Sequence, residues 1–335
     1  MRDLVEFMRT ERLISLPKII EASNTIERFV TRTPTYLSRT LSARRCAEVY
    51  LKLECFQPVG TFKIRGAINK VCHLSPPQIK LGFVTSSSGN HGLSTAYAAM
   101  IFGTKATVVV PRNATREKVE AIQSYGARVV RHGKDYDEAY TKALEIRKRT
   151  GATFIHPFND PFVIAGQGTI GLELLLDIPD LRTIIVPIGG GGLISGISVA
   201  AKSLNPHIKI VGVQPEGAPA IYLSWKAGKT VEVDSLNTVA DGLATRKPAK
   251  LTFRIIQKYV DSILLVTERE INEAVMTLLR SDRILAEPSG AASLAALLFK
   301  YSPRSLEKVA VIITGRNIST DYLATLLRSG TRHRN

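Results

Sequence analysis

Lys63 is the residue whose setting points most directly to chemistry, in the segment Thr61 to Gly66 (T-F-K-I-R-G). Thr61 is a suitable N-cap, which places Lys63 in the first turn of a predicted helix. Partial burial beside the helix's apolar stripe and the positive helix end both lower the pKa of a lysine. A neutral amine is the form that reacts with an aldehyde to give a Schiff base. An isolated lysine at a helix start is more often simply solvated, so this interpretation depends on other segments.

Four consecutive glycines follow a predicted strand over residues 183–187: Gly189, Gly190, Gly191 and Gly192. Because glycine has no Cβ, the backbone N–H groups of such a run can converge on one point. The helix that begins near Leu193 adds the positive end of its dipole. The run therefore predicts a phosphate site, although a tight strand-to-helix turn would need the same residues.

The same glycine run also approaches a dinucleotide-binding pattern. Gly190, Gly192 and Ser195 fall near the G-x-G-x-x-G spacing, and Glu216 follows about 20 residues later, where a ribose-binding acid is expected. A dinucleotide-dependent oxidoreductase is thus an alternative from another class. It leaves Lys63 without a role.

A loop of small polar residues, Ser86 to Gly92, separates a predicted strand over residues 82–86 from a predicted helix over residues 93–102. Small hydroxyl groups and glycine at a helix N-terminus suit a carboxylate. Asn90 is able to hydrogen-bond a phenolic or carboxylate oxygen. His91 is more often a packed histidine than a general base in such a position.

Thr314 follows a predicted strand over residues 309–313. Its hydroxyl group lies at the carboxyl end of that strand, where open α/β sheets bind ligands. A helix N-cap is an equally natural role for Thr314, and the two roles are compatible.

Strands and helices alternate along the chain, which predicts largely parallel sheets with helices on both faces. The expected strands lie at residues 49–53, 82–86, 106–110, 128–131, 153–156, 183–187, 209–213, 263–266 and 309–313. The carboxyl ends of parallel strands can gather the polar segments at one edge. A length of 335 residues favours two lobes, with residues 150–161 as the hinge.

Composition indicates a globular enzyme of the cytoplasm. The net charge is +16, from 45 Lys and Arg against 29 Asp and Glu, but the basic residues are dispersed and indicate a solvated surface rather than a nucleic-acid site. The three scattered cysteines suit a reducing compartment. We find no secretory signal at residues 1–10 and no apolar run of about 20 residues, so no membrane partner is predicted.

Together the polar segments resemble the fold-type II pyridoxal-phosphate enzymes, in particular the serine/threonine dehydratase and serine racemase group. The resemblance runs from about Ile19 to about Leu327, through F-K-I-R-G-A, S-S-G-N-H-G, A-G-Q-G-T at residues 165–169 and G-G-G-G-L. It implies a two-domain α/β, tryptophan synthase β-like fold with open, mostly parallel, twisted sheets. A small domain of residues 55–155 is then inserted into a large domain of residues 1–54 and 156–335.

The resemblance also implies a cofactor, pyridoxal 5'-phosphate, and a role for each segment. Lys63 is the Schiff-base lysine, and the glycine loop with the Leu193 backbone holds the phosphate. Asn90 is the partner of the phenolic oxygen, Thr314 that of the pyridine nitrogen, and Glu287 borders the ring. The resemblance implies that the substrate carboxylate is bound by Ser87, Ser88, Gly89, Asn90 and His91.

The implied reaction is that of an ammonia-lyase, or dehydratase, on a small 3-hydroxy amino acid. The default is L-threonine to 2-oxobutanoate or L-serine to pyruvate, with Lys63 as general base at Cα and the cofactor as electron sink. A neutral Thr314 hydroxyl does not hold the pyridine nitrogen protonated, which favours rapid loss of the β-hydroxyl group. Alternatives are a specialised enzyme such as a hydroxyectoine-utilisation dehydratase, and a serine racemase. Homodimers or homotetramers are usual in the group.

Three positions depart from the group's patterns. Ser88 stands where many threonine dehydratases carry alanine and serine racemases carry a proton-transferring serine. Gln214 and Ala220 align with the acids of the racemases' divalent-cation site, so no metal site is expected, although a local shift would bring Glu216 into register. Arg316 replaces a common glycine and is expected to point outward rather than towards the substrate.

Overall fold

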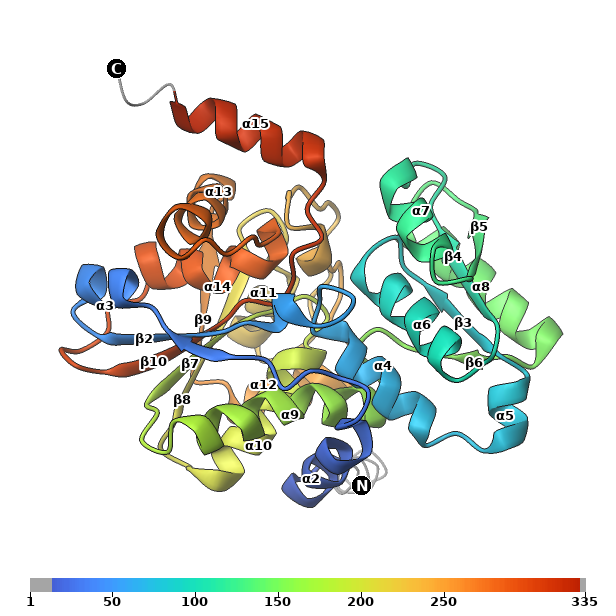
Figure 1. Ribbon diagram of the computed structural model, residues 1–335, viewed down its shortest axis with the longest axis horizontal. Coiled ribbons are helices and arrows are strands. Elements are labelled where there is room, and N and C mark those ends of the chain that lie inside the picture. Colours follow the sequence, from blue (N-terminus) through green and yellow to red (C-terminus); the bar gives the residue numbers. More distant parts are fainter. Residues whose placement is uncertain (1–13, 332–335) are drawn as a thin grey trace.

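The computed structural model describes residues 14–331 as an α/β molecule with two separate sheets, drawn side by side in Figure 1. The six-stranded sheet has the order β1 (Thr35–Leu37), β2 (Glu48–Lys52), β10 (Lys308–Ile312), β7 (Thr183–Pro187), β8 (Lys209–Pro215) and β9 (Ser262–Val266). Its strands are parallel except for β1, which pairs antiparallel with β2. The prediction of a largely parallel sheet is confirmed for this half.

The second sheet has four strands, all paired in parallel. Its order is β5 (Arg128–Arg131), β4 (Ala106–Val110), β3 (Phe83–Ser86) and β6 (Thr153–Phe154). The predicted strand over residues 153–156 is two residues too long, because β6 ends at Phe154 and the chain bends from Pro157 onward. Proline lacks the N–H group that a continuing ladder would need.

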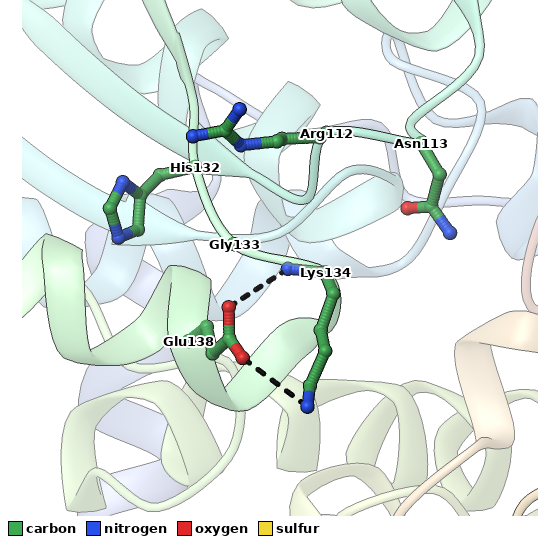
Figure 2. Close-up of a pocket in the computed structure, with 6 residues that line it drawn as sticks. All are labelled: Arg112, Asn113, His132, Gly133, Lys134 and Glu138. Atoms are coloured by element: carbon green, nitrogen blue, oxygen red, sulfur yellow. Dashed lines mark hydrogen bonds and ion pairs between the residues drawn. The ribbon is translucent and has the colours of Figure 1, made fainter.

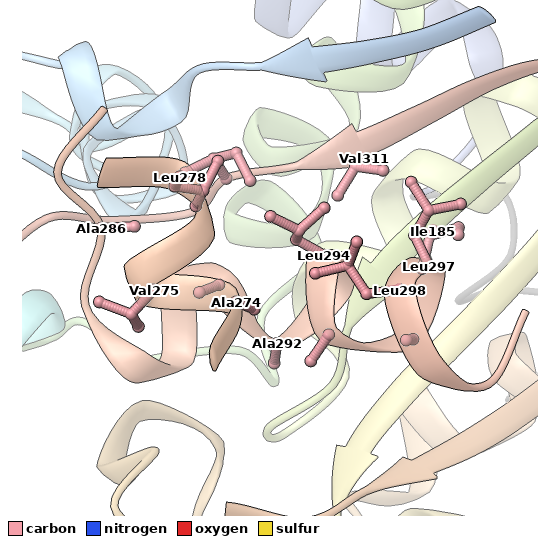
Figure 3. Packing of buried hydrophobic residues seen from close by; sticks show 14 of the residues in the cluster. Ile185, Ala274, Val275, Leu278, Ala286, Ala292, Leu294, Leu297, Leu298 and Val311 are labelled. Carbon is pink, nitrogen blue, oxygen red and sulfur yellow. The ribbon is translucent and has the colours of Figure 1, made fainter. Parts of the chain in front are cut away.

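Alternate side chains of the central strands enter two different cores. In β7, Ile184 packs with Ile194 and Ile197 of α10 (Gly192–Leu204) and with residues of α9 (Pro161–Asp177). On the other face, Ile185 packs with the leucines of α14 (Pro288–Phe299), as Figure 3 shows around Leu294 and Leu297. Burial on both faces explains why these strands read as continuous apolar runs in the sequence.

Helices cover both faces of the smaller sheet as well. On one face lie α4 (Lys63–Cys72), α6 (Asn90–Ile101) and α7 (Arg116–Gln123), whose apolar residues share a core with Phe83 and Val108. On the other face α8 (Tyr136–Thr150) packs on Val84 and Val109. The helices on both faces confirm the predicted α/β arrangement.

The remaining elements surround these layers. They are α2 (Leu16–Ile26), α3 (Arg39–Arg45), η1 (Glu54–Phe56), α5 (Pro76–Lys80), α11 (Ala220–Ala227), η2 (Asp241–Leu243), α12 (Lys250–Tyr259), α13 (Glu268–Thr277), η3 (Leu278–Asp282) and α15 (Thr320–Thr331). Within residues 14–331, none of these helices is long and apolar enough to cross a membrane. The prediction about a secretory signal concerns residues outside this range.

The A-G-Q-G-T motif lets three helices approach closely. A Cβ at Gly166 of α9 would lie 2.6 Å from the Arg65 carbonyl oxygen of α4. A Cβ at Gly196 of α10 would lie 2.3 Å from the Ile164 carbonyl oxygen of α9. Glycine is therefore required at these helix contacts, which bring α9 close to α4 on one side and to α10 on the other.

Helix α4 begins one residue later than expected. Phe62, not Thr61, occupies the capping position, and its side chain forms no cap hydrogen bond. The backbone of Thr61 instead pairs with Gly315, and the Phe62 N–H donates to the Thr314 carbonyl oxygen at 3.0 Å. This pairing ties the start of α4 to the segment that follows β10, and it keeps Lys63 in the first turn.

Candidate active site

One cavity of about 850 Å³ brings together every site residue that the sequence predicted. Its walls include Lys63, Ser87, Ser88, Gly89, Asn90, His91, Gly189, Gly190, Gly191, Gly192, Leu193, Glu287 and Thr314. The loops come from the carboxyl ends of β3 in one sheet and of β7 and β10 in the other. The expectation that the edge of one sheet gathers them is therefore replaced by a cavity between two sheets.

Lys63 enters this cavity without an anionic partner. Its Nζ donates a hydrogen bond to the Pro157 carbonyl oxygen at 3.1 Å and lies 5.0 Å from the centre of the Phe62 ring. Among the described residues, no ion pair joins it to a carboxylate. Burial lowers the pKa of Lys63 from 10.5 to about 8, because desolvation disfavours the ammonium form. The amine is thus neutral in a useful fraction near neutral pH.

The glycine loop has no room for side chains. A Cβ at Gly190 would lie 2.2 Å from the Phe158 ring, and one at Gly189 would lie 2.7 Å from the Gly242 carbonyl oxygen. Gly191 has φ +88°, a left-handed conformation that favours glycine. The loop leads directly into α10, whose first N–H groups have no acceptor within the helix. These features fit a phosphate group.

The loop after β3 combines polar atoms that lack partners with a neutral histidine. Within residues 14–331, the buried Ser86 hydroxyl and the Nδ1 atom of His91 have no hydrogen-bond partner. The other ring nitrogen of His91, Nε2, lies 2.9 Å from the Ile155 carbonyl oxygen and therefore carries the hydrogen. Burial lowers the pKa of His91 to about 3. His91 is thus a packed neutral histidine, as expected.

A polar chain crosses the cavity wall from Asn317 through Asn90 to Glu287. The Asn317 amide donates to Asn90 Oδ1 at 2.7 Å, and Asn90 Nδ2 donates to Glu287 Oε1 at 2.6 Å. Burial raises the pKa of Glu287 to about 7, and the charge of Asp241 adds to this shift. Asn317 fixes which end of the Asn90 side chain is the donor.

Thr314 is buried beside this chain and contacts the Ser289 carbonyl oxygen at 3.4 Å. It leaves a neutral hydroxyl group at the carboxyl end of β10, where the sequence placed it. The helix that follows, α15, begins only at Thr320, so Thr314 is not its N-cap.

The outer wall contains charged pairs that the sequence did not reveal. Lys118 of α7 forms an ion pair with Asp241 of η2, and Arg246 lies 3.9 Å from Asp137 of α8. All four residues line the cavity and join the small sheet's helices to the loops around the large sheet. No spacing pattern signals such pairs, since their members lie more than a hundred residues apart.

Of the residues that departed from the family patterns, Ser88 lines the cavity, whereas Arg316 and Gln214 do not. Arg316 is exposed and is not among the lining residues, in agreement with its expected outward direction. Gln214 is buried, contacts the Ile188 carbonyl oxygen at 3.3 Å and accepts from the Tyr222 N–H at 2.8 Å. Glu216 is exposed and does not line the cavity, so it makes no contact with a ligand bound at the glycine loop. Across residues 14–331 no cluster of three metal-binding side chains occurs.

A second cavity, of about 520 Å³, lies in the smaller half of the molecule. Figure 2 shows its six lining residues, with Glu138 accepting from the Lys134 N–H at 3.0 Å and lying 3.6 Å from the Lys134 amine. None of the residues predicted for the active site lines it. Lys63 and the glycine loop identify the larger cavity as the candidate active site.

The geometry defines a class of protein, and comparison with known families agrees. Residues 26–315 match the family of pyridoxal-phosphate dependent enzymes, so the chain belongs to this family and its cofactor is pyridoxal 5'-phosphate. The predicted fold-type II architecture is confirmed by solved relatives. Maize serine racemase superposes with a TM-score of 0.89 at 38% identity, covering 95% of this chain and 98% of that one.

Particular relatives carry more specific names. A protein of Thermotoga maritima named L-threonine ammonia-lyase is 46% identical over 318 residues, which are 95% of this chain and 79% of that protein. The catabolic L-threonine dehydratase TdcB of Staphylococcus aureus is 39% identical, over 96% of this chain and 94% of that protein. The processed threonine deaminase isoform 2 of Solanum lycopersicum superposes with a TM-score of 0.90 at 33% identity, covering 96% and 88%.

Proposed function

We propose that this protein is a pyridoxal-phosphate-dependent ammonia-lyase acting on L-threonine, with L-serine as a second substrate. The observation that carries the proposal is Lys63, an amine without an anionic partner that faces the glycine loop and the Ser86–Gly92 loop across one cavity. The names of the relatives, threonine ammonia-lyase and threonine dehydratase, support this choice of substrate.

The residues present fit the cofactor. Gly189 to Gly192 and the Leu193 N–H would hold the phosphate, since the left-handed turn at Gly191 leads the loop into the N-terminus of α10. Asn90 would donate to the phenolic oxygen, and Thr314 would place its hydroxyl group at the pyridine nitrogen. Glu287 would border the ring. Bound pyridoxal phosphate supplies an aldehyde that takes up an amine and a ring that delocalises the electron pair released at Cα.

Other side chains would bind the substrate and move its protons. Ser87 to His91 would bind the substrate carboxylate through the hydroxyl groups and the first N–H groups of α6. Lys63, once its amine is free, would remove the Cα proton, and its lowered pKa keeps the basic form available. Departure of the β-hydroxyl group as water, followed by hydrolysis, gives the 2-oxo acid and ammonia.

The neutral hydroxyl group at Thr314 would favour elimination over other outcomes. A carboxylate there would hold the pyridine nitrogen protonated and stabilise the carbanion for longer. We expect Thr314→Asp to shift the partition towards transamination or racemisation, measured as the ratio of products. An unchanged ratio would remove Thr314 from this account.

Serine racemisation is the second candidate, and Ser88 is the observation that favours it. Ser88 lines the cavity together with Asn90, and its hydroxyl group would transfer a proton if it lies on the cofactor face opposite Lys63. Serine racemases are among the solved relatives. If Ser88 transfers a proton, Ser88→Ala abolishes interconversion of L- and D-serine while threonine elimination continues.

The deciding experiment is an assay of 2-oxo acid and ammonia release over a panel of 3-hydroxy amino acids, with chiral analysis of the remaining substrate. We expect L-threonine to give the highest kcat/KM and L-serine a lower one. Activity confined to a specialised substrate, such as an intermediate of hydroxyectoine utilisation, would overturn the threonine assignment. Inversion without elimination would favour the racemase.

We also propose a small domain of residues 55–155 and a large domain of residues 1–54 and 156–335. The strands of each sheet come from only one of these ranges, which supports the division. We propose a homodimer or homotetramer, because these assemblies are usual in the family. We propose the cytoplasm as the compartment, because the three cysteines are free. Light scattering of the purified protein and cell fractionation test these two points.

A further inference from the structure

The turn between β6 and α9 is organised by the ring of His156. Its Nδ1 accepts hydrogen bonds from the Asn159 N–H at 2.8 Å and from the Phe158 N–H at 3.2 Å. The ring also meets Phe158 edge-on, with 4.8 Å between ring centres. His156 does not line the active-site cavity, so any effect on chemistry acts through the residues of this turn.

Both neighbours in the turn contact the machinery of the active site. The Pro157 carbonyl oxygen accepts the hydrogen bond from Lys63 Nζ at 3.1 Å. The Phe158 ring fills the space beside the glycine loop, where a Cβ at Gly190 would lie 2.2 Å away. A shift of this turn would therefore move two groups together: the Pro157 carbonyl oxygen that accepts from Lys63, and the Phe158 ring that packs against the glycine loop.

The ring of His156 is suited to this role only while it is neutral. Burial lowers the pKa of His156 to about 4; the nearby Asp160 opposes the shift and Lys63 adds to it. Since Nδ1 accepts two hydrogen bonds, the ring hydrogen is on Nε2. Nδ1 thus remains an acceptor throughout the ordinary pH range.

We propose that His156 is a positioning residue for cofactor capture: through Nδ1 it holds the turn that sets the Pro157 carbonyl oxygen against Lys63 and the Phe158 ring against Gly190. The inference rests on the proposed role of Lys63 as the Schiff-base lysine. It predicts that an acceptor at the δ position of residue 156 is required, whereas the Nε2 side of the ring is dispensable.

The test compares two substitutions that separate the ring nitrogens. His156→Asn places an amide oxygen near the position of Nδ1, and His156→Gln places its amide near the position of Nε2. The readouts are the affinity of the apoprotein for pyridoxal phosphate, the absorption band of the bound cofactor, and the melting temperature of the apoprotein. We expect His156→Asn to stay within about threefold of wild-type affinity and His156→Gln to lose about 10- to 100-fold, since two hydrogen bonds are lost.

His132→Gln is the matched control, because His132 lines the second cavity and not the active site. It should bind the cofactor as the wild type does. Equal affinities for His156→Asn and His156→Gln would overturn the inference. If His156→Gln does not fold, His156→Asn decides alone: wild-type affinity supports the inference, and a loss of tenfold or more contradicts it. A wild-type protein that takes up no cofactor on Lys63 would instead refute the proposed function.

Discussion

Helix α4 carries two inward-pointing basic residues, Lys63 and Arg65, in opposite environments. Residues two apart on a helix point to different sides, so the two side chains reach different environments although they are close in sequence. Arg65 is only 1% exposed and lies between two carboxylates. Lys63, at the cavity, has a carbonyl oxygen as its hydrogen-bond acceptor.

The centre around Arg65 is saturated with partners. Its guanidinium group donates to Glu54 at 2.8 Å and to Glu173 at 2.6 Å, and a further hydrogen bond reaches Thr169 at 3.0 Å. Although burial opposes the charge, both carboxylates raise the pKa of Arg65. For Glu54, burial raises the pKa, but the charges of Arg65 and Lys52 and the hydrogen bonds from Arg65 and Thr33 together lower it further, so the net shift is downward.

The difference shows what separates a structural charge from a reactive one. Paired carboxylates fix the Arg65 charge permanently and anchor α4 to η1 and α9. Without such a partner, burial instead drives Lys63 towards the neutral amine. The rigid centre at Arg65 thus holds the reactive amine in place at the cavity.

The largest expected effect is on activity at the unpaired amine. Lys63→Ala should lower kcat for threonine elimination by at least about 10²–10⁴-fold, the contribution typical of a general base. The melting temperature should hardly change, because no ion pair is broken. The control is Lys80→Ala, an exposed lysine of α5. Normal turnover by Lys63→Ala would place the chemistry elsewhere.

The largest effect on stability should come from the paired centre. Among the described residues, Arg65→Met leaves the buried Glu54 without an ion-pair partner and Glu173 with Lys52 alone, and it should lower the free energy of unfolding by about 3–5 kcal/mol. Urea titration measures this loss. Arg116→Met is the matched control, since Arg116 pairs with Glu120 at 2.6 Å on the surface. Removing that exposed pair should leave the free energy of unfolding almost unchanged, because solvent screens the charges. Equal losses of unfolding free energy in Arg65→Met and Arg116→Met would mean that burial of the ion pair does not matter.

A smaller effect on stability and cofactor affinity is expected at the glycine loop. Gly190→Ala forces a Cβ against the Phe158 ring and should cost about 1–3 kcal/mol, as overpacking commonly does. Affinity for pyridoxal phosphate should fall with it. Phe158→Ala in the same chain opens the space and should restore part of the loss. The absence of any rescue would show that the clash with this ring is not the cause.

The smallest effect is expected at the charged pair of the cavity's outer wall. Lys118 and Asp241 are both partly exposed, so their ion pair should contribute about 1 kcal/mol or less. Lys118→Met should raise KM for threonine less than about tenfold, with kcat nearly unchanged. Lys142→Met, which breaks the surface pair with Glu145 outside the cavity, is the control. A loss of kcat as large as that of Lys63→Ala would make Lys118 part of the chemistry.

Much of this arrangement is visible in the sequence, for physical reasons. Strands buried on both faces give unbroken apolar runs, so β7 was predicted at its observed bounds and β10 one residue late. The antiparallel edge strand β1 was not predicted, since three residues are too few to show a pattern. Three of the four site segments follow strands. Those after β7 and β10 meet because the two strands are neighbours in one sheet, whereas the loop after β3 comes from the second sheet, which the sequence did not reveal.

Other features depend on how the two sheets are placed against each other. The contact of the Pro157 carbonyl oxygen with Lys63 spans 94 residues, and the pair of Lys118 with Asp241 spans 123. The start of α4 at Lys63 rather than at residue 62 depends on the backbone pairing of Thr61 with Gly315. No local pattern encodes such contacts.

The central claim is that Lys63 is an amine with a lowered pKa and no anionic partner within residues 14–331, and that it captures the cofactor aldehyde. The most direct test adds pyridoxal phosphate to the apoprotein at a series of pH values, reduces with borohydride, and measures the label on Lys63 by mass spectrometry. A pKa lowered to about 8 means that the reactive fraction rises with pH and is half complete near pH 8. We predict a label on Lys63 with that midpoint. A midpoint near the ordinary 10.5, or a label on another lysine, would contradict the account.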